Sequence, residues 1–325
     1  MWYAGRRLCV VWLILAAILG GAVAVSAAKA TEGRVLDRVA ARVNNEIITE
    51  NELLVAAFGH ARRTEGSLPG TMPDVRAVLQ SMIDERLLAQ AAREEIKEIP
   101  EEAITNRVEA IVKDQRAPFP TEKAFRAKIE EQGWDLESFK AYLREQEIRT
   151  YLIQAALARR AQARMTDQDE KAYVEELKRK GESLVQYRLR QILVAQPAQP
   201  TAAEAAQARQ RMLGILEEVR KGVPFEQLAR ERSDDKATRA SDGDLGWIAE
   251  KDLKPPILEA VRSLEKGQTS NPVPTEKGIH LFQLIRKRTV RDLLFEKRLE
   301  EARKTWVGEL RRRAQIKILL PQLAE

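Results

Sequence analysis

The spacing of apolar residues changes twice along this chain, and these changes most constrain how it can fold. From residue 74 to about residue 163, apolar side chains recur at intervals of three and four, which is typical of helices that bury one face. At 187–194 and again at 278–285 they alternate, which is typical of strands. After residue 290 the helical spacing returns. The sequence therefore predicts a helical stretch, a mixed stretch and a second helical stretch.

The first stretch opens with an expected hairpin at 38–48, where Asn44 and Asn45 suit a tight turn between alternating residues. Thr49 with Glu52 has the spacing of a capping box that starts a helix, and Thr166 with Asp169 has the same spacing. The expected helices are 50–60, 74–95, 101–114, 122–131, 135–163 and 167–179.

The middle stretch mixes strands and helices. We expect a strand at 187–194, helices at 201–221 and 224–230, a small strand after a polar loop, a helix from Pro255 and a closing strand at 278–285. The predicted order of β-α-α-β-α-β-β in about a hundred residues indicates a compact α+β domain.

The last stretch predicts a helix followed by a short strand. Phe295, Leu299 and Trp306 fall on one helical face, and Ile316 and Ile318 then alternate. The hairpin at the start offers an open sheet edge for this strand. The predicted fold is therefore α+β, with a helical body formed by 31–181 and 291–325 and an α+β domain at 182–290 inserted between them.

Residues 1–30 have the features of a secretory signal peptide. Arg6 and Arg7 precede an apolar run that ends in the small-residue pattern at 28–30, so we expect cleavage after Ala30. An uncleaved membrane anchor is the alternative, since the apolar run is long enough to span a bilayer. Whether these residues are a cleaved signal peptide or an uncleaved anchor, we expect the rest of the chain to be exported to the periplasm. Cleavage would remove Cys9, the only cysteine, which suits an oxidising compartment.

Composition argues against several classes of function. The chain has two histidines, His60 and His280, and one cysteine, too few for a zinc site built from these ligands, so we expect no metal and no cofactor. Without residues 1–30 the net charge of +6 falls to +3, with both signs interleaved. Binding of nucleic acid would need a clustered basic face, so we expect none. Only 17 residues are aromatic, which favours a helix-rich chain.

Five short motifs, taken together, resemble the parvulin family of peptidyl-prolyl isomerases. They are Arg-Gln-Ile-Leu-Val at 190–194, Phe-Glu-Gln-Leu-Ala at 225–229, Ser-Asp-Asp at 233–235, Gly-Asp-Leu-Gly at 243–246 and Gly-Ile-His at 278–280. The segments that flank them, Val-Ala-Ala-Arg-Val-Asn-Asn-Glu-Ile-Ile at 39–48 and the terminal helix with Trp306, resemble the SurA family of periplasmic chaperones.

This resemblance implies a function and a set of site residues. It implies a parvulin domain on a helical body that holds unfolded proline-containing polypeptides, commonly outer-membrane protein precursors. By the family pattern, Leu245, Leu253 and Ile257 would line the proline pocket, while Asp235 and His280 would lie at its polar end. Each also has a simpler reading: His280 as a hydrogen-bonded core histidine, Asp235 as a turn or cap residue, and the three aliphatic residues as ordinary core.

The chain departs from the family pattern at Gln191. Many active parvulins have a first histidine there, and glutamine can hydrogen-bond His280 without carrying an imidazole's charge. No Lys or Arg occurs from Gln191 to Ala208, where phosphate-directed parvulins place a basic cluster, so we expect no recognition of phosphoserine-proline. The alternatives to an isomerase with chaperone activity are a chaperone whose parvulin domain only docks peptides, and a scaffold that binds no client.

Overall fold

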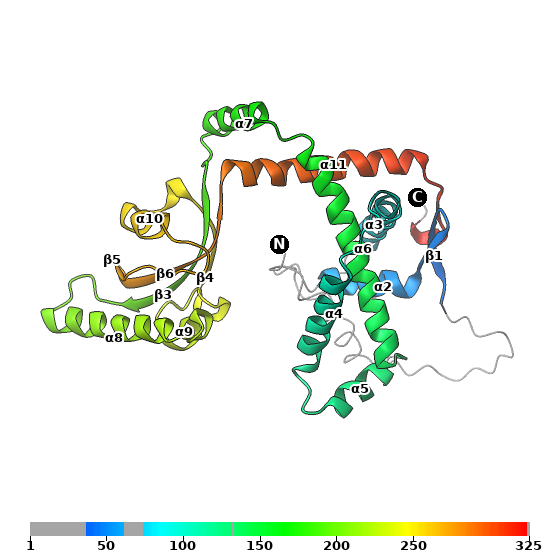
Figure 1. Cartoon of the computed structure of the whole chain (residues 1–325). Helices are drawn as coiled ribbons and strands as arrows, with labels where there is room; N and C mark the ends of the chain where they lie inside the picture. The colour runs from blue at the N-terminus through cyan, green and yellow to red at the C-terminus, as the bar shows by residue number, and fades with distance from the viewer. Residues whose placement is uncertain (1–36, 62–73, 132, 324–325) are drawn as a thin grey trace. The chain divides into compact units, whose positions relative to one another are not determined.

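The computed structural model describes residues 37–61, 74–131 and 133–323 of the 325-residue chain. Contacts within the chain divide it into two compact units. The first combines residues up to Ala161 with Leu299–Glu325, and the second consists of Gln162–Arg298. Figure 1 labels the helices and most of the strands of both units.

The first unit contains a three-stranded antiparallel sheet built from both ends of the chain. β1 (Val39–Val43) and β2 (Glu46–Thr49) form a hairpin, and Asn44 in its turn has a φ of 54°, a left-handed conformation that asparagine tolerates. β7 (Ile316–Ile318) pairs with β1, so the strand order is β2-β1-β7. The expected pairing of the C-terminal strand with the hairpin is confirmed.

The helices of the first unit begin and end close to their expected positions. Thr49 and Glu52 form the predicted capping box, in which the backbone N–H of each residue donates to the side chain of the other. The Asp74 carboxylate caps the next helix by accepting from the Ala77 N–H. The helices are α2 (Glu50–Ala61), α3 (Val75–Glu95), α4 (Glu101–Arg116), α5 (Glu122–Glu131), α6 (Leu136–Gln162) and the C-terminal part of α11 (Val290–Arg313), followed by a short 3-10 turn, η3 (Pro321–Leu323).

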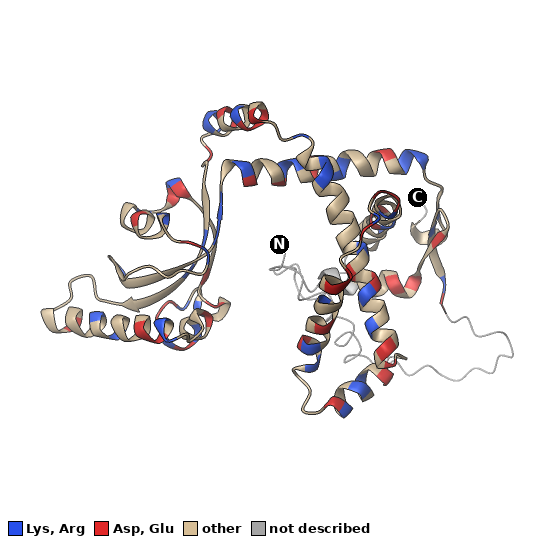
Figure 2. Cartoon of the chain, viewed as in Figure 1, with Lys and Arg blue, Asp and Glu red and all other residues tan. Residues whose placement is uncertain are grey.

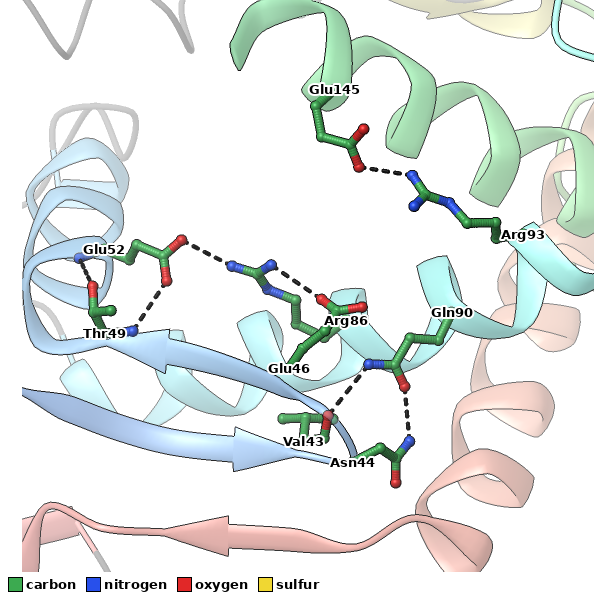
Figure 3. Close-up of polar contacts among 9 residues, drawn as sticks. All are labelled: Val43, Asn44, Glu46, Thr49, Glu52, Arg86, Gln90, Arg93 and Glu145. Atoms are coloured by element: carbon green, nitrogen blue, oxygen red, sulfur yellow. Dashed lines mark hydrogen bonds and ion pairs between the residues drawn. The ribbon is translucent and has the colours of Figure 1, made fainter. Parts of the chain in front are cut away.

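Polar contacts fasten the hairpin to α3, as Figure 3 shows. Arg86 of α3 forms ion pairs with Glu46 at 3.1 Å and with Glu52 at 2.9 Å. One turn further along α3, the Gln90 side chain accepts a hydrogen bond of 2.7 Å from the Asn44 amide in the hairpin turn. Since Arg86 and Gln90 are four residues apart, they lie on one face of α3 and hold two points of the hairpin.

The apolar core of the first unit depends on the C-terminal helix. Trp306 of α11 is 5% exposed and packs with buried residues of α3, α4, α5 and α6. The Arg160 guanidinium lies 3.6 Å from the centre of the Trp306 ring, an attractive cation–π contact, and donates two hydrogen bonds to Glu95 at 2.5 and 2.6 Å. These hydrogen bonds hold the pKa of the Glu95 carboxyl below its usual value. Arg160 of α6 thus joins the end of α3 to α11.

The second unit is a four-stranded antiparallel sheet with helices on both faces. Its elements follow the predicted β-α-α-β-α-β-β order. The sequence supplied no limits for two of the strands, which the structure places at Asp244–Ala249 and Val273–Thr275. The elements are β3 (Gln186–Ala195), α8 (Ala202–Arg220), α9 (Phe225–Arg232), β4 (Asp244–Ala249), α10 (Pro255–Arg262), β5 (Val273–Thr275) and β6 (Gly278–Arg288), with short 3-10 turns η1 (Arg239–Ser241) and η2 (Glu250–Asp252). The strand order is β4-β3-β6-β5 (Figure 1).

Alternation along β3 and β6 gives this sheet two different faces. Ile192 and Leu281 belong to a core with α8 and α9. Leu189 and Phe282 belong to a second core on the opposite face, with Val261 of α10. The mixed α+β architecture expected from the sequence is therefore present.

One helix is grouped differently from the sequence expectation. The range 31–181 placed α7 (Asp167–Arg179) in the helical body, whereas the structure groups it with the second unit. Leu177 is the only residue of α7 that is buried. Ion pairs hold the helix to the start of α11, including Glu176 with Lys297 at 2.7 Å and Asp169 with Arg298 at 2.9 Å. Partners so distant in sequence leave no trace in local apolar spacing.

Both signs of charge alternate along the helices of each unit (Figure 2). Within the described ranges, none of the helices combines the length and apolar character needed to cross a bilayer. The predicted leader, residues 1–30, and its alternative as an anchor lie outside the described residues.

We expect Trp306→Ala to destabilise the first unit by about 3–5 kcal/mol, because it removes a large buried aromatic side chain. The measurement is hydrogen–deuterium exchange of the full chain, in which amides of β1, α3 and α6 should lose protection. Leu319→Ala is the control: Leu319 is 43% exposed, so its truncation should change stability by less than about 0.5 kcal/mol. Equal protection in the two variants would contradict a core that depends on α11.

Candidate functional site

Three polar residues singled out by the sequence meet on one face of the second unit's sheet. Gln191 lies on β3, His280 on β6, and Asp235 in the loop after α9. The Gln191 side-chain nitrogen lies 2.5 Å from Oδ2 of Asp235, and its oxygen lies 3.1 Å from Nδ1 of His280. The structure therefore brings together residues that are 44 and 89 positions apart.

Two glycines allow the backbone around this group to close. The Gly243 carbonyl accepts from the Gln191 N–H at 2.9 Å, and a Cβ at Gly243 would lie only 2.4 Å from the Gln191 carbonyl oxygen. A Cβ at Gly278 would lie 2.1 Å from the Val194 carbonyl oxygen. Both glycines have positive φ, 76° and 136°, which side chains disfavour. The Gly-Asp-Leu-Gly and Gly-Ile-His motifs are thus places where the chain packs directly against β3.

Asp235 is held by hydrogen bonds from its own loop. The Thr238 hydroxyl donates to Oδ2 at 2.6 Å, and the Ala237 N–H donates to Oδ1 at 3.2 Å. Burial raises the pKa of the Asp235 carboxyl, but the hydrogen bonds from Thr238 and Gln191 outweigh it and keep the pKa below its usual value. Asp235 is therefore an anion at neutral pH.

His280 is 6% exposed, and burial lowers its pKa below the ordinary value of 6.5. The negative charge of Asp235 opposes this shift, and the positive charge of Lys277 adds to it. Nε2 of His280 lies 2.8 Å from the Thr275 hydroxyl of β5. At neutral pH the imidazole is therefore uncharged and hydrogen-bonded at both ring nitrogens.

The three aliphatic residues singled out by the sequence all pack against one apolar core. Leu245 lies on β4, Leu253 just before α10, and Ile257 in α10. Their side chains are partly exposed and pack against the core that contains Phe282. Phe282 faces Gln191 across the β3–β6 pair, and its ring is parallel to that of His280, with centres 5.5 Å apart. The polar group and the apolar cluster therefore adjoin on one face of the sheet.

Sequence reasoning missed Thr238, Thr275 and Phe282. Phe282 could have been found because it is two residues after His280 on a strand and so shares its face. Thr238 follows Asp235 by three residues, a spacing at which a hydroxyl can reach back to a carboxylate. Thr275 offered no such signal, since only the β5–β6 turn brings it to His280.

This arrangement suits binding and polarisation more than bond-breaking chemistry. The imidazole is neutral, and an anion lies one amide away from it. Among the residues that the structure describes, no three His, Cys, Asp or Glu side chains converge in a way that could hold a metal ion. Partly exposed aliphatic side chains beside a buried polar group can hold a small apolar ring and place its polar neighbour against fixed hydrogen-bonding groups.

Two family models match separate parts of the chain. Residues 192–286 match the family model of the PPIC-type PPIase domain, so the chain carries a parvulin-type peptidyl-prolyl isomerase domain. Residues 36–156 match the SurA N-terminal domain. The chain thus combines these two kinds of domain.

Among the curated relatives are proteins named Chaperone SurA. That of Methylococcus capsulatus is 33% identical over 126 residues, which cover 35% of this chain and 28% of the relative. That of Nitrosococcus oceani is 28% identical over 255 residues, which cover 77% of this chain and 58% of the relative. The aligned part of the chain therefore spans little more than a quarter of the first relative and little more than half of the second.

Two solved structures align with parts of the chain. A PpiC-type peptidyl-prolyl cis-trans isomerase domain is 30% identical and covers 33% of this chain and 94% of its own, with a TM-score of 0.30. PrsA from Bacillus subtilis is 23% identical and covers 88% of this chain and 96% of its own, also with a TM-score of 0.30.

The lowered pKa of His280 predicts a pH dependence of stability. Below about pH 6.5 the unfolded chain takes up a proton on this histidine, while the folded chain does not until its lower pKa is reached. The free energy of unfolding should therefore fall as the pH drops through this window and then level off. Urea unfolding of the second unit at about pH 7.5 and 5.5 should show a larger loss in wild type than in His280→Gln. Identical losses would mean that His280 is not buried as described.

Proposed function

We propose that this protein is an exported folding factor that binds unfolded polypeptides and catalyses cis/trans isomerisation of their X-Pro peptide bonds. The observation that carries the proposal is the hydrogen-bonded group of Gln191, Asp235 and His280 beside partly exposed aliphatic residues. The match to the PPIC-type PPIase domain supports the same reaction. We assign this activity to residues 182–290 of the second unit, and we propose that the first unit is the body that carries it.

The reaction requires rotation about an amide and no bond cleavage. The barrier of ~18–20 kcal/mol comes from amide resonance, so catalysis means binding the twisted amide better than the planar one. In this proposal Leu245, Leu253 and Ile257 hold the proline ring, while His280 and its partners present fixed polar groups to the twisting bond. Uncatalysed isomerisation takes tens to hundreds of seconds, which is slow enough to delay folding.

The isomerase proposal is tested with the full chain and a short proline-containing peptide, by following relaxation from cis to trans. Wild type should accelerate relaxation, and Leu253→Ala should lower kcat/KM by about tenfold or more, because the truncation removes apolar contact with the proline ring. Leu213→Ala is the matched control, since Leu213 lies on α8 and is 51% exposed. Wild-type rates equal to the uncatalysed background would refute isomerase activity.

We further propose that the clients are outer-membrane protein precursors in the periplasm. Support comes from the leader-like pattern of residues 1–30 and from the match of residues 36–156 to the SurA N-terminal domain. The sequence stretch without Lys or Arg from Gln191 to Ala208 argues against recognition of phosphorylated clients. A chaperone whose parvulin domain only docks peptides remains the second candidate, and a foldase that keeps its N-terminal segment in the membrane is a variant of the first.

A second measurement separates these candidates. The full chain should suppress light scattering from an unfolded porin diluted out of urea, and His280→Gln should retain this suppression because the body carries it. If wild type suppresses scattering while its peptide isomerisation rate equals the uncatalysed background, the parvulin domain acts only as a docking platform. If wild type does not suppress scattering, the chaperone proposal fails.

A further inference from the structure

The hydrogen bonds of the site have a direction that the chemistry of Asp235 fixes. An ionised carboxylate can only accept hydrogen bonds. Its Oδ2 lies 2.5 Å from one end of the Gln191 side-chain amide, so that end must be the NH2 group. The opposite orientation would place two oxygens against each other at that distance. The amide oxygen of Gln191 is therefore turned toward His280.

The orientation of Gln191 in turn determines which nitrogen of His280 carries the proton. The amide oxygen lies 3.1 Å from Nδ1 and can only accept, so Nδ1 must be the donor. Because the buried imidazole is neutral, Nε2 is left without a proton. It accepts from the Thr275 hydroxyl at 2.8 Å, which is closer than the Gly278 carbonyl oxygen at 3.3 Å from the same hydroxyl. The order of donation is Thr275 to His280, His280 to Gln191 and Gln191 to Asp235.

We propose that Gln191 is a positioning residue whose amide, oriented by Asp235, holds His280 as the single neutral tautomer protonated at Nδ1. The inference rests on the proposed isomerase function for its importance, but not for its test. An imidazole in place of Gln191 could exchange donor and acceptor roles by moving a proton between its ring nitrogens. In an amide the oxygen always accepts and the NH2 group always donates, so the roles change only if the side chain turns over. In this chain the orientation of the Gln191 amide therefore sets which ring nitrogen of His280 donates and which accepts.

The charged groups near His280 are consistent with this role. Asp235 is the anion that acts on His280, and Lys277 at the β5–β6 turn is the cation. Thr238 gives Asp235 a second donor at Oδ2, and the Ala237 N–H occupies Oδ1. The position of the carboxylate therefore does not depend on Gln191 alone, so Asp235 can impose an orientation on the amide.

The Ala237 N–H also determines what Asp235→Asn would do. In that variant the new side-chain oxygen must face the Ala237 N–H, because two donors would otherwise meet there. The new NH2 group then faces Gln191 and Thr238, whose hydroxyl can accept as well as donate. Gln191 would have to present its oxygen to this NH2 group and its own NH2 group to Nδ1. His280 would then carry its proton on Nε2.

The test is long-range nitrogen–proton NMR of histidine-labelled full-length protein. A His60→Gln background leaves His280 as the only histidine, so its two ring nitrogens can be assigned without ambiguity. At neutral pH the wild-type residue 280 should show a protonated Nδ1 and a bare Nε2. Asp235→Asn should move the proton to Nε2. Thr275→Val should leave it on Nδ1, because Thr275 only follows the tautomer that Gln191 sets.

Several outcomes would overturn the inference. They are a wild-type proton on Nε2, an unchanged tautomer in folded Asp235→Asn, or a switched tautomer in Thr275→Val. If Asp235→Asn does not fold, Gln191→Leu replaces it, and there both tautomers should be populated; retention of Nδ1–H alone would refute the role of Gln191. Because the spectrum does not depend on turnover, an inactive protein with Nδ1–H would support this inference while removing the isomerase proposal.

Discussion

The pairing of β3 with β6 is the interaction on which the candidate site depends. Ten residues of β3 find partners on β6, from Gln186 opposite Arg288 to Ala195 opposite Gly278. This register sets His280 opposite Leu193 and Phe282 opposite Gln191, on the face that α10 partly covers. A shift by one residue would exchange the faces and move His280 into the core beneath α8 and α9.

The first unit depends in the same way on a segment distant in sequence. Trp306 enters a core built from α3 to α6, and β7 adds a third strand to the N-terminal hairpin. A hairpin by itself is marginally stable, so the third strand and the helices beneath it share in its stability. The chain therefore runs from the first unit into the second and then returns to the first. The two segments of the first unit share one apolar core and one sheet.

The sequence predicted most of the helices and strands, but only some of the residues that meet at the candidate site. The capping pairs at Thr49 and Thr166 marked helix starts, and alternation marked β3 and β6. The Gly-Ile-His motif pointed to His280. By contrast, α7 was expected in the helical body, whereas the contacts within the chain group it with the second unit, in part through ion pairs to residues more than a hundred positions away. Thr275 was missed because its role arises from a turn.

The sequence by itself determined the positions of helices and strands, because apolar spacing and capping residues act over a few residues. It also supplied the residue types of the site: one carboxylate, one amide and one imidazole. Only the tertiary structure decided how these groups are directed. The amide of Gln191 is oriented by Asp235, 44 residues away. It in turn determines which ring nitrogen of His280, 89 residues away, carries the proton. A hydrogen bond acquires a direction only when donor and acceptor meet, and folding alone brings them together.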